Sequence, residues 1–290
     1  DMNYDIDWID AFTDIPFGGN GCAVVHNSAG LSDERCISLV RETSLVECSF
    51  TSPSTIADFR VRYFLYNREI PFAGHPTLAT VASLHHRGLI GDGTVILETK
   101  AGLVPVKIDD GLITMTQIAP NFGAYVPATL VAPIGTISVR DIVHQPRLVS
   151  TGLQFCVCVV KDRATLEAVR LDTVALRAYF DYLELQEGNA MEPFWITQFG
   201  ATSDGDSYSR LLLTPPGPLE DPFTGSATGA MAAYLWSEGL IEKPAFIAEQ
   251  GHGMGRPGKA LVEVLGARDA ITGVAVSGRA HVLFSGNLYL

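Results

Sequence analysis

A segment that occurs twice constrains the fold of this chain more than any other feature. Residues 69–90 and 220–241 align at a fixed offset of 151 residues and are identical at 11 of 22 positions. Unrelated segments of ordinary composition would share roughly one or two positions, so the match indicates a duplicated unit. The offset is about half of the 290 residues, and the duplication therefore predicts two related halves.

Length and composition agree with two domains. The chain is 47% hydrophobic and 18% charged, which is enough apolar material for two cores. Its net charge of −12 repels phosphate backbones and anionic membranes at long range. Neither nucleic acid nor a membrane is therefore expected as a partner. No run of 18 apolar residues appears, and residues 1–5 lack the basic and apolar regions of a signal peptide, so we expect a cytoplasmic protein.

The sequence indicates neither a metal site nor a nucleotide cofactor. The five cysteines are odd in number and lie in apolar contexts, which favours reduced thiols. Cys156 and Cys158 are spaced to share one face of a strand, but no second pair stands at metal-ligand spacing. We interpret them as packed core thiols rather than zinc ligands. Neither half contains a phosphate-binding loop, and the spacing Gly253-x-Gly255-x-x-Gly258 precedes an expected strand rather than the helix that a dinucleotide-binding motif requires.

Short strands and two enclosed helices dominate the expected secondary structure. After each Phe-x-Gly, a helix is expected that is apolar on nearly every side, so it must be surrounded by other elements. Pro76 suits the first position of one of them. Residues 119–135, rich in Pro, Ala and Gly, are expected to be a linker. The helices are expected at 76–86 and 226–238, with others at 33–43 and between 163 and 184, and the strands at 4–12, 22–26, 45–50, 59–65, 95–99, 103–108, 112–118, 153–160, 194–199, 208–214, 245–249, 260–265, 271–276 and 280–284.

The two helix starts have the properties of an anion site. A helix N-terminus offers unpaired N–H groups and the positive end of the helix dipole. Two such ends would hold a carboxylate if a pseudo-twofold axis brought them face to face. The copies differ where His75 aligns with Ser226 and Ile70 with Asp221, as an asymmetric active site would require. The alternative is that Ser226 caps its helix and His75 is a satisfied polar residue.

Six sequence blocks follow one another along the whole chain: Asp10-Ala11-Phe12-Thr13-x-x-Pro16-Phe17-Gly18-Gly19-Asn20, Leu45-Val46-Glu47-Cys48, Pro71-Phe72-Ala73-Gly74-His75-Pro76-Thr77, Ser150-Thr151-Gly152-Leu153, Asp221-Pro222-Phe223-Thr224-Gly225-Ser226-Ala227 and Glu249-Gln250-Gly251-x-x-Met254-Gly255-Arg256-Pro257. Together they resemble the phenazine-biosynthesis PhzF family. The resemblance implies an α+β fold like that of diaminopimelate epimerase, with two pseudo-symmetric halves that are each a curved, mostly antiparallel sheet around a central helix. The halves would be 1–118, joined by the C-terminal strand 278–290, and 119–277, and the family commonly forms homodimers.

The resemblance also assigns roles to site residues. It implies a cofactor-independent isomerase that acts in biosynthesis, within secondary metabolism, and in which Glu47 moves the proton. The other expected catalytic residues are His75 and Asp221, which with Ser226 would shape the site. Asn20 of the Gly-Asn loop is expected to contact the substrate. Main-chain N–H groups at Gly74, His75, Gly225 and Ser226 would hold its carboxylate and stabilise developing charge.

Two departures from related patterns bear on the mechanism. The family's Ser-Glu-Thr is Val46-Glu47-Cys48 here, which keeps the acid and loses its polar flanks. We interpret Cys48 as a packing residue. Diaminopimelate epimerase uses two cysteines where this chain has His75 and Ser226, so a two-thiol mechanism is not available.

These features predict an isomerase that moves a proton on a small unsaturated or cyclic carboxylic acid in a cleft between the halves. Glu47 would act first as base and then as acid, and its apolar neighbours would raise its pKa towards neutrality. The alternatives are epimerisation at one carbon, a cyclisation triggered by protonation, or a catalytically silent module that binds a small molecule or a protein. The residues do not name the substrate.

Overall fold

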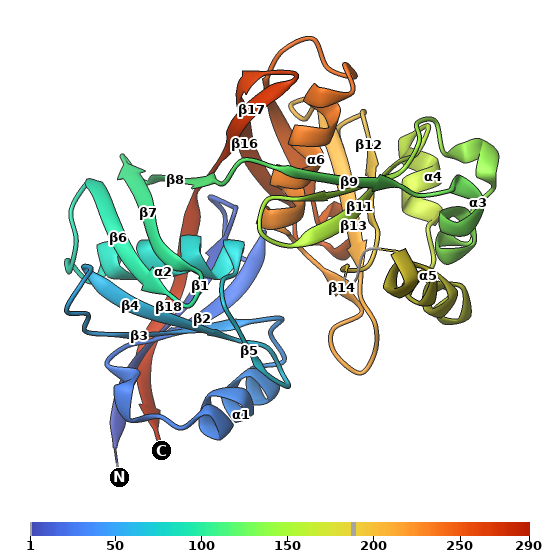
Figure 1. The fold of residues 1–290 in the computed structure, drawn as a ribbon. Coiled ribbons are helices and arrows are strands. Elements are labelled where there is room, and N and C mark those ends of the chain that lie inside the picture. The colour runs from blue at the N-terminus through green and yellow to red at the C-terminus, as the bar shows by residue number, and fades with distance from the viewer. Residues whose placement is uncertain (1, 187–189) are drawn as a thin grey trace. The chain divides into compact units, whose positions relative to one another are not determined.

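Each copy of the duplicated segment forms a short strand followed by a long buried helix. In the first copy β5 (Glu69–Ile70) precedes α2 (Gly74–His86), and in the second β14 (Glu220–Asp221) precedes α6 (Gly225–Ser237). The computed structural model of the protein describes residues 2–186 and 190–290. It divides into a first unit, which runs to Thr116 and includes Ser277–Leu290, and a second unit, Gln117–Val276 (Figure 1).

The first unit is a mostly antiparallel sheet that packs on α2. Its strand pairs are antiparallel except for β2 with β3 and β4 with β6. Its strands are β1 (Asn3–Ala11), β2 (Asn20–Val25), β3 (Cys48–Ser52), β4 (Phe59–Phe64), β5, β6 (Gly93–Thr99), β7 (Gly102–Asp109), β8 (Leu112–Gln117, whose last residue belongs to the second unit) and β18 (Ala280–Tyr289).

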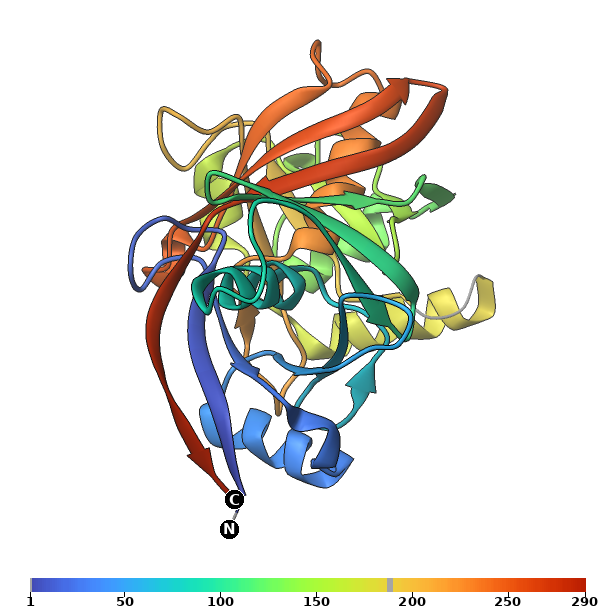
Figure 2. The ribbon, with the colours of Figure 1, turned by 90° about the vertical axis from the view of Figure 1, so that its left-hand side faces the viewer.

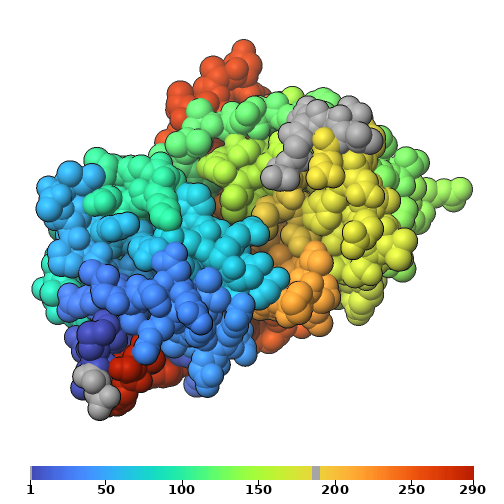
Figure 3. Space-filling view, turned by 60° about the horizontal axis from the view of Figure 1, so that its bottom comes forward, coloured from blue at the N-terminus to red at the C-terminus, as the bar shows by residue number. Residues whose placement is uncertain are grey.

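The C-terminal strand completes the sheet of the first unit. It pairs with β1 along its length, from Asn3 opposite Tyr289 to Ala11 opposite Ala280. Figure 2 shows the two strands side by side with α2 lying across them, and Figure 3 shows their ends adjacent on the surface. On the other side of the sheet, α1 (Asp33–Thr43) covers a core that includes Val40, Phe50 and Phe64. Ser32 caps this helix by accepting a hydrogen bond from the Arg35 N–H, as its position predicts.

The second unit repeats the arrangement around α6, which contacts β10, β11 and β16. Here too most pairs are antiparallel, with β11–β12 and β13–β15 parallel. The strands are β9 (Asn121–Tyr125), β10 (Arg147–Ser150), β11 (Gln154–Val159), β12 (Phe194–Thr197), β13 (Ser207–Leu212), β14, β15 (Ala245–Gln250), β16 (Gly258–Ala267) and β17 (Ala270–Gly278, whose last two residues belong to the first unit). The helices are α3 (Ala128–Val131), α4 (Arg163–Ala168), α5 (Thr173–Gln186) and α6, and short 3₁₀ turns are η1 (Ser28–Gly30, in the first unit), η2 (Ala132–Gly135), η3 (Val139–Asp141) and η4 (His252–Met254).

The prediction of a linker over residues 119–135 is wrong. The segment contains β9, α3 and η2, and Val126, Val131 and Ile134 belong to the core of the second unit. Its small, weakly charged composition is typical of a linker, but its apolar side chains recur at positions that face this core. Composition alone did not separate a loosely patterned core segment from a connection.

The identities within the duplicated segment explain how both helices end. Gly88 and Gly239 follow α2 and α6 with φ of 69° and 71°, a left-handed conformation that glycine adopts without strain. The next N–H, of Leu89 or Leu240, bonds back to the carbonyl of Leu84 or Leu235. These paired contacts form the same C-terminal capping motif in each copy, so the shared residues specify the scaffold.

The first identity of the repeat, Glu69 with Glu220, is explained by a partly buried ion pair that each glutamate forms. Arg62 donates through Nε and Nη2 to the carboxylate of Glu69, at 2.9 and 2.8 Å. Arg210 makes the same two-pronged contact with Glu220, at 2.8 and 3.2 Å. Each pair joins two neighbouring strands, β4 to β5 and β13 to β14. The sequence comparison identified the glutamates but not their arginine partners.

The predicted α+β class, with a mostly antiparallel sheet and a central helix in each half, is confirmed. Pro76 is the third residue of α2 rather than the first. Proline is tolerated there because the first four helical N–H groups have no partner within the helix. No helix among the described residues is long and apolar enough to cross a membrane.

Candidate active site

In the first unit, the start of α2 meets the starts of two neighbouring strands. β2 and β3 run parallel, with Ala23 opposite Cys48, so the residues that precede them lie at the same edge of the sheet. Asn20 begins β2 and Glu47 directly precedes β3. His75 is the second residue of α2, and its Nδ1 lies 3.2 Å from Asn20 Nδ2 and 3.4 Å from Glu47 Oε2.

Glu47 lies in the connection between α1 and β3 rather than within a strand. The sequence predicted a strand over residues 45–50, but β3 begins at Cys48. Ser44, in a left-handed conformation, ends α1 and turns the chain towards the sheet. The side chain of Glu47 is 16% exposed, which leaves the carboxylate reachable while most of it is covered.

His75 is a buried, uncharged histidine. It is 3% exposed, and burial lowers its pKa to about 3 although a hydrogen bond to the backbone of Gly21 acts in the opposite direction. The contact with Glu47 is therefore not an ion pair at neutral pH. We assign the proton to Nδ1, because the Glu47 carboxylate and the Gly21 carbonyl are both acceptors. This assignment exchanges the amide oxygen and nitrogen of Asn20, since the structure places Nδ2 against the ring.

The other ring nitrogen of His75 is buried without a hydrogen-bond partner among the described residues. Buried polar atoms of this kind are uncommon and call for an explanation. With the proton on Nδ1, Nε2 carries a lone pair that can accept a hydrogen bond. The alternative that His75 is a fully satisfied polar residue is therefore wrong.

We expect His75 to stay neutral from pH 8 to about pH 4. Its folded pKa of about 3 lies below the ordinary value of 6.5, so protonation begins only in strong acid. The measurement is a titration followed by the ¹⁵N shifts of the imidazole. A His75 that gained a proton between pH 7 and pH 5 would contradict this environment.

In the second unit, Asp221 is held by a ring of hydrogen bonds at the start of α6. Thr224 donates its hydroxyl to Asp221 Oδ2 at 2.6 Å. Gln250 donates to the Asp221 carbonyl at 2.9 Å and to Thr224 Oγ1 at 3.2 Å, and accepts from the Thr224 N–H at 3.1 Å. Asp221 is 5% exposed. The arrangement fixes the carboxylate on the strand that leads into the helix.

Neither of the two helices has a side-chain cap. The N-cap residues are Ala73 for α2 and Thr224 for α6, and no side-chain capping hydrogen bond is formed at either. Thr224 uses its hydroxyl on Asp221 instead. The alternative in which Ser226 caps α6 is thus wrong, because Ser226 is the second residue inside the helix. The main-chain donors at Gly74, His75, Gly225 and Ser226 thus begin both helices without a capping hydrogen bond from the N-cap side chain.

Two residues that the sequence reasoning did not select support the start of α6. Gln117 Nε2 donates to the Gly225 carbonyl at 2.9 Å, and Thr151 donates to Gln117 Oε1 at 2.6 Å. Gly229 makes room for this amide, because a Cβ there would lie 1.7 Å from Gln117 Oε1. Thr151 stood in a recognised block of the sequence, but nothing around Gln117 indicated its role.

The cysteines lie in the cores, as predicted. All five are free and buried. Cys48 packs in the core under α1, and burial raises its pKa to about 12, so it does not supply a thiolate beside Glu47. Cys156 and Cys158 pack in the core of the second unit.

The site residues thus fall into two sets, each defined within its own unit. The first unit brings together Asn20, Glu47, Gly74 and His75. The second brings together Asp221, Gly225 and Ser226 at the start of α6. The first set pairs a carboxylate with a neutral imidazole, and the second pairs a carboxylate with an uncapped helix start.

Comparison with known proteins identifies the family. A family model described as phenazine biosynthesis-like protein matches residues 9–286. An uncharacterized isomerase of Bacillus subtilis, YfhB, is 31% identical over 288 residues, which cover 94% of this chain and 96% of the relative. The trans-2,3-dihydro-3-hydroxyanthranilate isomerase of Pseudomonas aeruginosa is 32% identical over 295 residues, covering 97% of this chain and 98% of that protein.

Solved structures agree on the fold. A Bacillus anthracis phenazine biosynthesis protein of the PhzF family superposes with a TM-score of 0.86 at 26% identity, over the whole of both chains. A hydroxyproline epimerase from Agrobacterium vitis shares the fold at a TM-score of 0.64 and 13% identity, covering 99% of this chain and 91% of that one. The chain belongs to the phenazine biosynthesis-like (PhzF) family and is an isomerase of that family.

Proposed function

We propose that this isomerase moves a proton between two carbons of a small unsaturated or cyclic carboxylic acid, without a cofactor. The observation that carries the proposal is the contact of Glu47 with a buried, neutral His75 at the start of α2. A carboxylate there can take up and return a proton, because it is largely covered and still 16% exposed. The P. aeruginosa relative supports the substrate class, since its name describes an isomerase of a hydroxylated dihydroanthranilate.

Glu47 acts as the only proton carrier in this mechanism. Its carboxylate removes a proton from a carbon next to the unsaturated system, and the carbon–hydrogen electron pair enters that system as the double bond shifts. The resulting carboxylic acid returns the same proton to the other end of the system. Atoms and charge balance without a second acid or base, and Glu47 ends in its starting form.

His75 orients the carboxylate and contacts the substrate in this proposal. Its Nδ1 proton points to Glu47 Oε2, which fixes the direction of the carboxylate without adding a positive charge. A cationic imidazole would favour ionised Glu47 and oppose the uptake of a proton. Nε2, which has no partner in the described structure, accepts a hydrogen bond from a hydroxyl or amine of the substrate.

The uncapped helix starts hold the carboxylate of the substrate and stabilise charge that develops during proton removal. Main-chain N–H groups at a helix N-terminus bind anions and are fixed before the reaction starts. We assign this role to Gly74 and His75 in α2 and to Gly225 and Ser226 in α6. Asp221, fixed by Thr224 and Gln250, orients a donor group of the substrate.

Isotope exchange tests the proposal. The protein is incubated in deuterated water with a panel of unsaturated and cyclic carboxylic acids that includes trans-2,3-dihydro-3-hydroxyanthranilate, and the products are analysed by mass and by the position of label. We expect a shifted double bond, with deuterium at the carbon that received the proton and partial retention of the original hydrogen. Absence of exchange with every acid would contradict the proposal. Label at an unshifted carbon with inverted configuration would identify an epimerase instead.

A further inference from the structure

Helix α2 is buried on nearly every side but has one polar edge. Thr77, Thr80 and Ser83 are buried within the helix, and Arg87 follows its last residue. Their spacings of three, three and four residues place them along one side of the helix. We call these four residues the polar line of α2. An apolar helix in this environment would pack without them, so their partners are informative.

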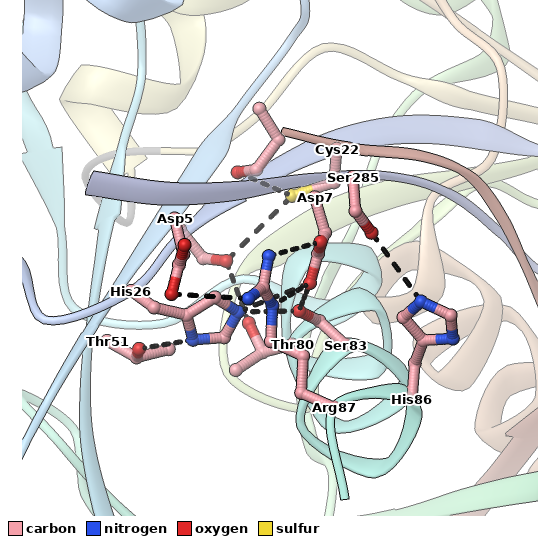
Figure 4. Close-up of polar contacts among 12 residues, drawn as sticks. Asp5, Asp7, Cys22, His26, Thr51, Thr80, Ser83, His86, Arg87 and Ser285 are labelled. Atoms are coloured by element: carbon pink, nitrogen blue, oxygen red, sulfur yellow. Dashed lines mark hydrogen bonds and ion pairs between the residues drawn. The ribbon is translucent and has the colours of Figure 1, made fainter. Parts of the chain in front are cut away.

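Each residue of the polar line meets a polar side chain from the next strand of the sheet. The order of the partners follows the order of the strands, from β4 through β3 and β2 to β1. His26 directly follows β2, and the contacts around Ser83 and Arg87 are drawn in Figure 4. The pairs are Tyr63 Oη with Thr77 Oγ1 at 2.6 Å, Ser49 Oγ with Thr80 Oγ1 at 2.7 Å, His26 Nε2 with Ser83 Oγ at 2.7 Å, Ser83 Oγ to Asp7 Oδ2 at 2.5 Å, and Arg87 Nε and Nη2 to the Asp7 carboxylate, both at 2.7 Å.

The match between helix and sheet follows from their repeat distances. Three residues of an α-helix advance by about 4.5 Å, and neighbouring strands lie about 4.8 Å apart. From Thr77 to Arg87 the helix advances by about 15 Å, close to the three strand spacings from β4 to β1. A helix that lies across the strands, as Figure 2 shows for β1 and β18, can therefore present one polar residue to each strand in turn.

We infer that the polar line is a positioning device. It sets the rotation of α2 about its axis and its position along that axis, and through them the place of His75 against Glu47. A slip or rotation of the helix would separate several buried polar pairs at once, including the carboxylate of Asp7, which is fully buried. Apolar contacts alone tolerate small shifts, whereas these hydrogen bonds do not. Tyr63, Ser49 and Asp7 are thus positioning residues, and this role rests on the proposed function of Glu47 and His75.

Tyr63→Phe tests the inference because it removes one hydroxyl and keeps the ring. Thr77 retains its own hydrogen bond to the Ala73 carbonyl at 2.7 Å, so the helix loses only its link to β4. We expect a change in the ¹⁵N shifts of His75 and a fall in kcat of about tenfold with little change in KM, since small misplacements of catalytic groups are costly. Tyr234→Phe is the matched control: its hydroxyl bonds to the Gln145 carbonyl at 2.8 Å in the second unit, and it should leave the His75 resonances and kcat unchanged.

A second background separates positioning from general stability. If Tyr63 acts through His75, Tyr63→Phe should lose its effect on kcat when His75 is already glutamine, while its cost in the urea midpoint remains. Unmoved His75 resonances, or an undiminished loss of kcat in the His75→Gln background, would overturn the inference. Should no acid be turned over, the proposed function fails and the His75 resonances alone decide the positioning role. If Tyr63→Phe does not fold, Ser49→Ala removes the next link and is judged by the same resonances.

Discussion

Replacement of Glu47 by glutamine is expected to lower kcat/KM by about 10²–10⁴-fold, the range that positioned acid–base groups supply. Glutamine has nearly the same size and keeps an oxygen that can accept from His75, but it cannot take up the transferred proton. The protein should fold normally, because the side chain lies in a partly exposed connection rather than in the core. Turnover of the acid identified by isotope exchange, and the exchange itself, measure the effect.

Glu98→Gln is the matched control for this substitution. Glu98 lies in the same unit, on β6, and accepts a hydrogen bond from Ser54 at 2.8 Å, so the change removes a charge without touching the proposed site. Its turnover should equal that of the unmodified protein. If Glu47→Gln also retains full turnover, the base is a different residue and the proposed mechanism is wrong.

The pH dependence of the reaction separates Glu47 from His75. Burial keeps His75 neutral above a pH of about 3, so a loss of kcat/KM between pH 7 and pH 4 does not come from protonation of this imidazole. The acid limb should therefore persist in His75→Gln, at a lower overall rate. Its disappearance in that variant would show that His75 is the titrating group and would contradict the buried, uncharged state.

The repeated segment shows which parts of the fold could be predicted from sequence. Its identities marked helix ends, because Gly88 and Gly239 are required where the chain turns left-handed after α2 and α6. Its differences marked chemistry, because His75 and Asp221 stand where the other copy has Ser226 and Ile70. Helix positions depend on local patterns, and local patterns are what a sequence displays.

Features that depend on a particular side-chain partner were not predictable from local patterns. Nothing near Glu69 pointed to Arg62 as a two-pronged partner, and nothing near Asp221 pointed to Gln250, which lies 29 residues later. A strand was expected over residues 45–50, but β3 begins at Cys48, one residue after Glu47. Ser44 ends α1, and the connection to the sheet takes up the residues between them. Apolar flanks resemble a strand whether or not the residues enter the ladder.

The same reasoning applies to the polar line of α2. The sequence showed a helix that is apolar nearly all round, and the few polar residues at 77, 80 and 83 had no evident purpose. Their meaning depends on the order of the strands across the sheet, which the sequence does not display. Asp7 alternates with apolar residues in β1 and would be expected to face solvent, yet it is fully buried beneath α2. A polar residue in an alternating strand can thus face the core when a hydrogen-bonding or charged partner is present there.

Asp7→Asn is expected to cost about 3–5 kcal/mol of unfolding free energy at pH 7, the usual penalty for breaking one side of a buried ion pair. The carboxylate accepts two hydrogen bonds from Arg87 and one from Ser83. Burial acts to raise its pKa, but hydrogen bonds from His26, Arg87 and Ser83 outweigh it and hold the pKa well below the ordinary value of 3.8. Asparagine would present an N–H₂ group to donors and leave the guanidinium without its main partner. Asp5→Asn is the matched control, because Asp5 lies on the same strand and only 3.3 Å from Arg87 Nη1 but has a half-exposed side chain, and such a pair contributes about 1 kcal/mol or less. Equal costs for the two substitutions would show that the buried pair does not hold α2.

The sign of the pH dependence provides an independent check on Asp7. Its folded pKa is lowered, so the unfolded chain binds the proton more readily. The stability that its charge contributes is therefore fully present above the unfolded value near 3.8, and is lost as the pH falls from there through the folded pKa. Urea unfolding at a series of pH values should show a constant difference between the unmodified protein and Asp7→Asn from pH 8 to about pH 5, and a shrinking one in stronger acid. A difference that already shrinks between pH 7 and pH 5 would mean that Asp7 is not held in its ionised form beneath the helix.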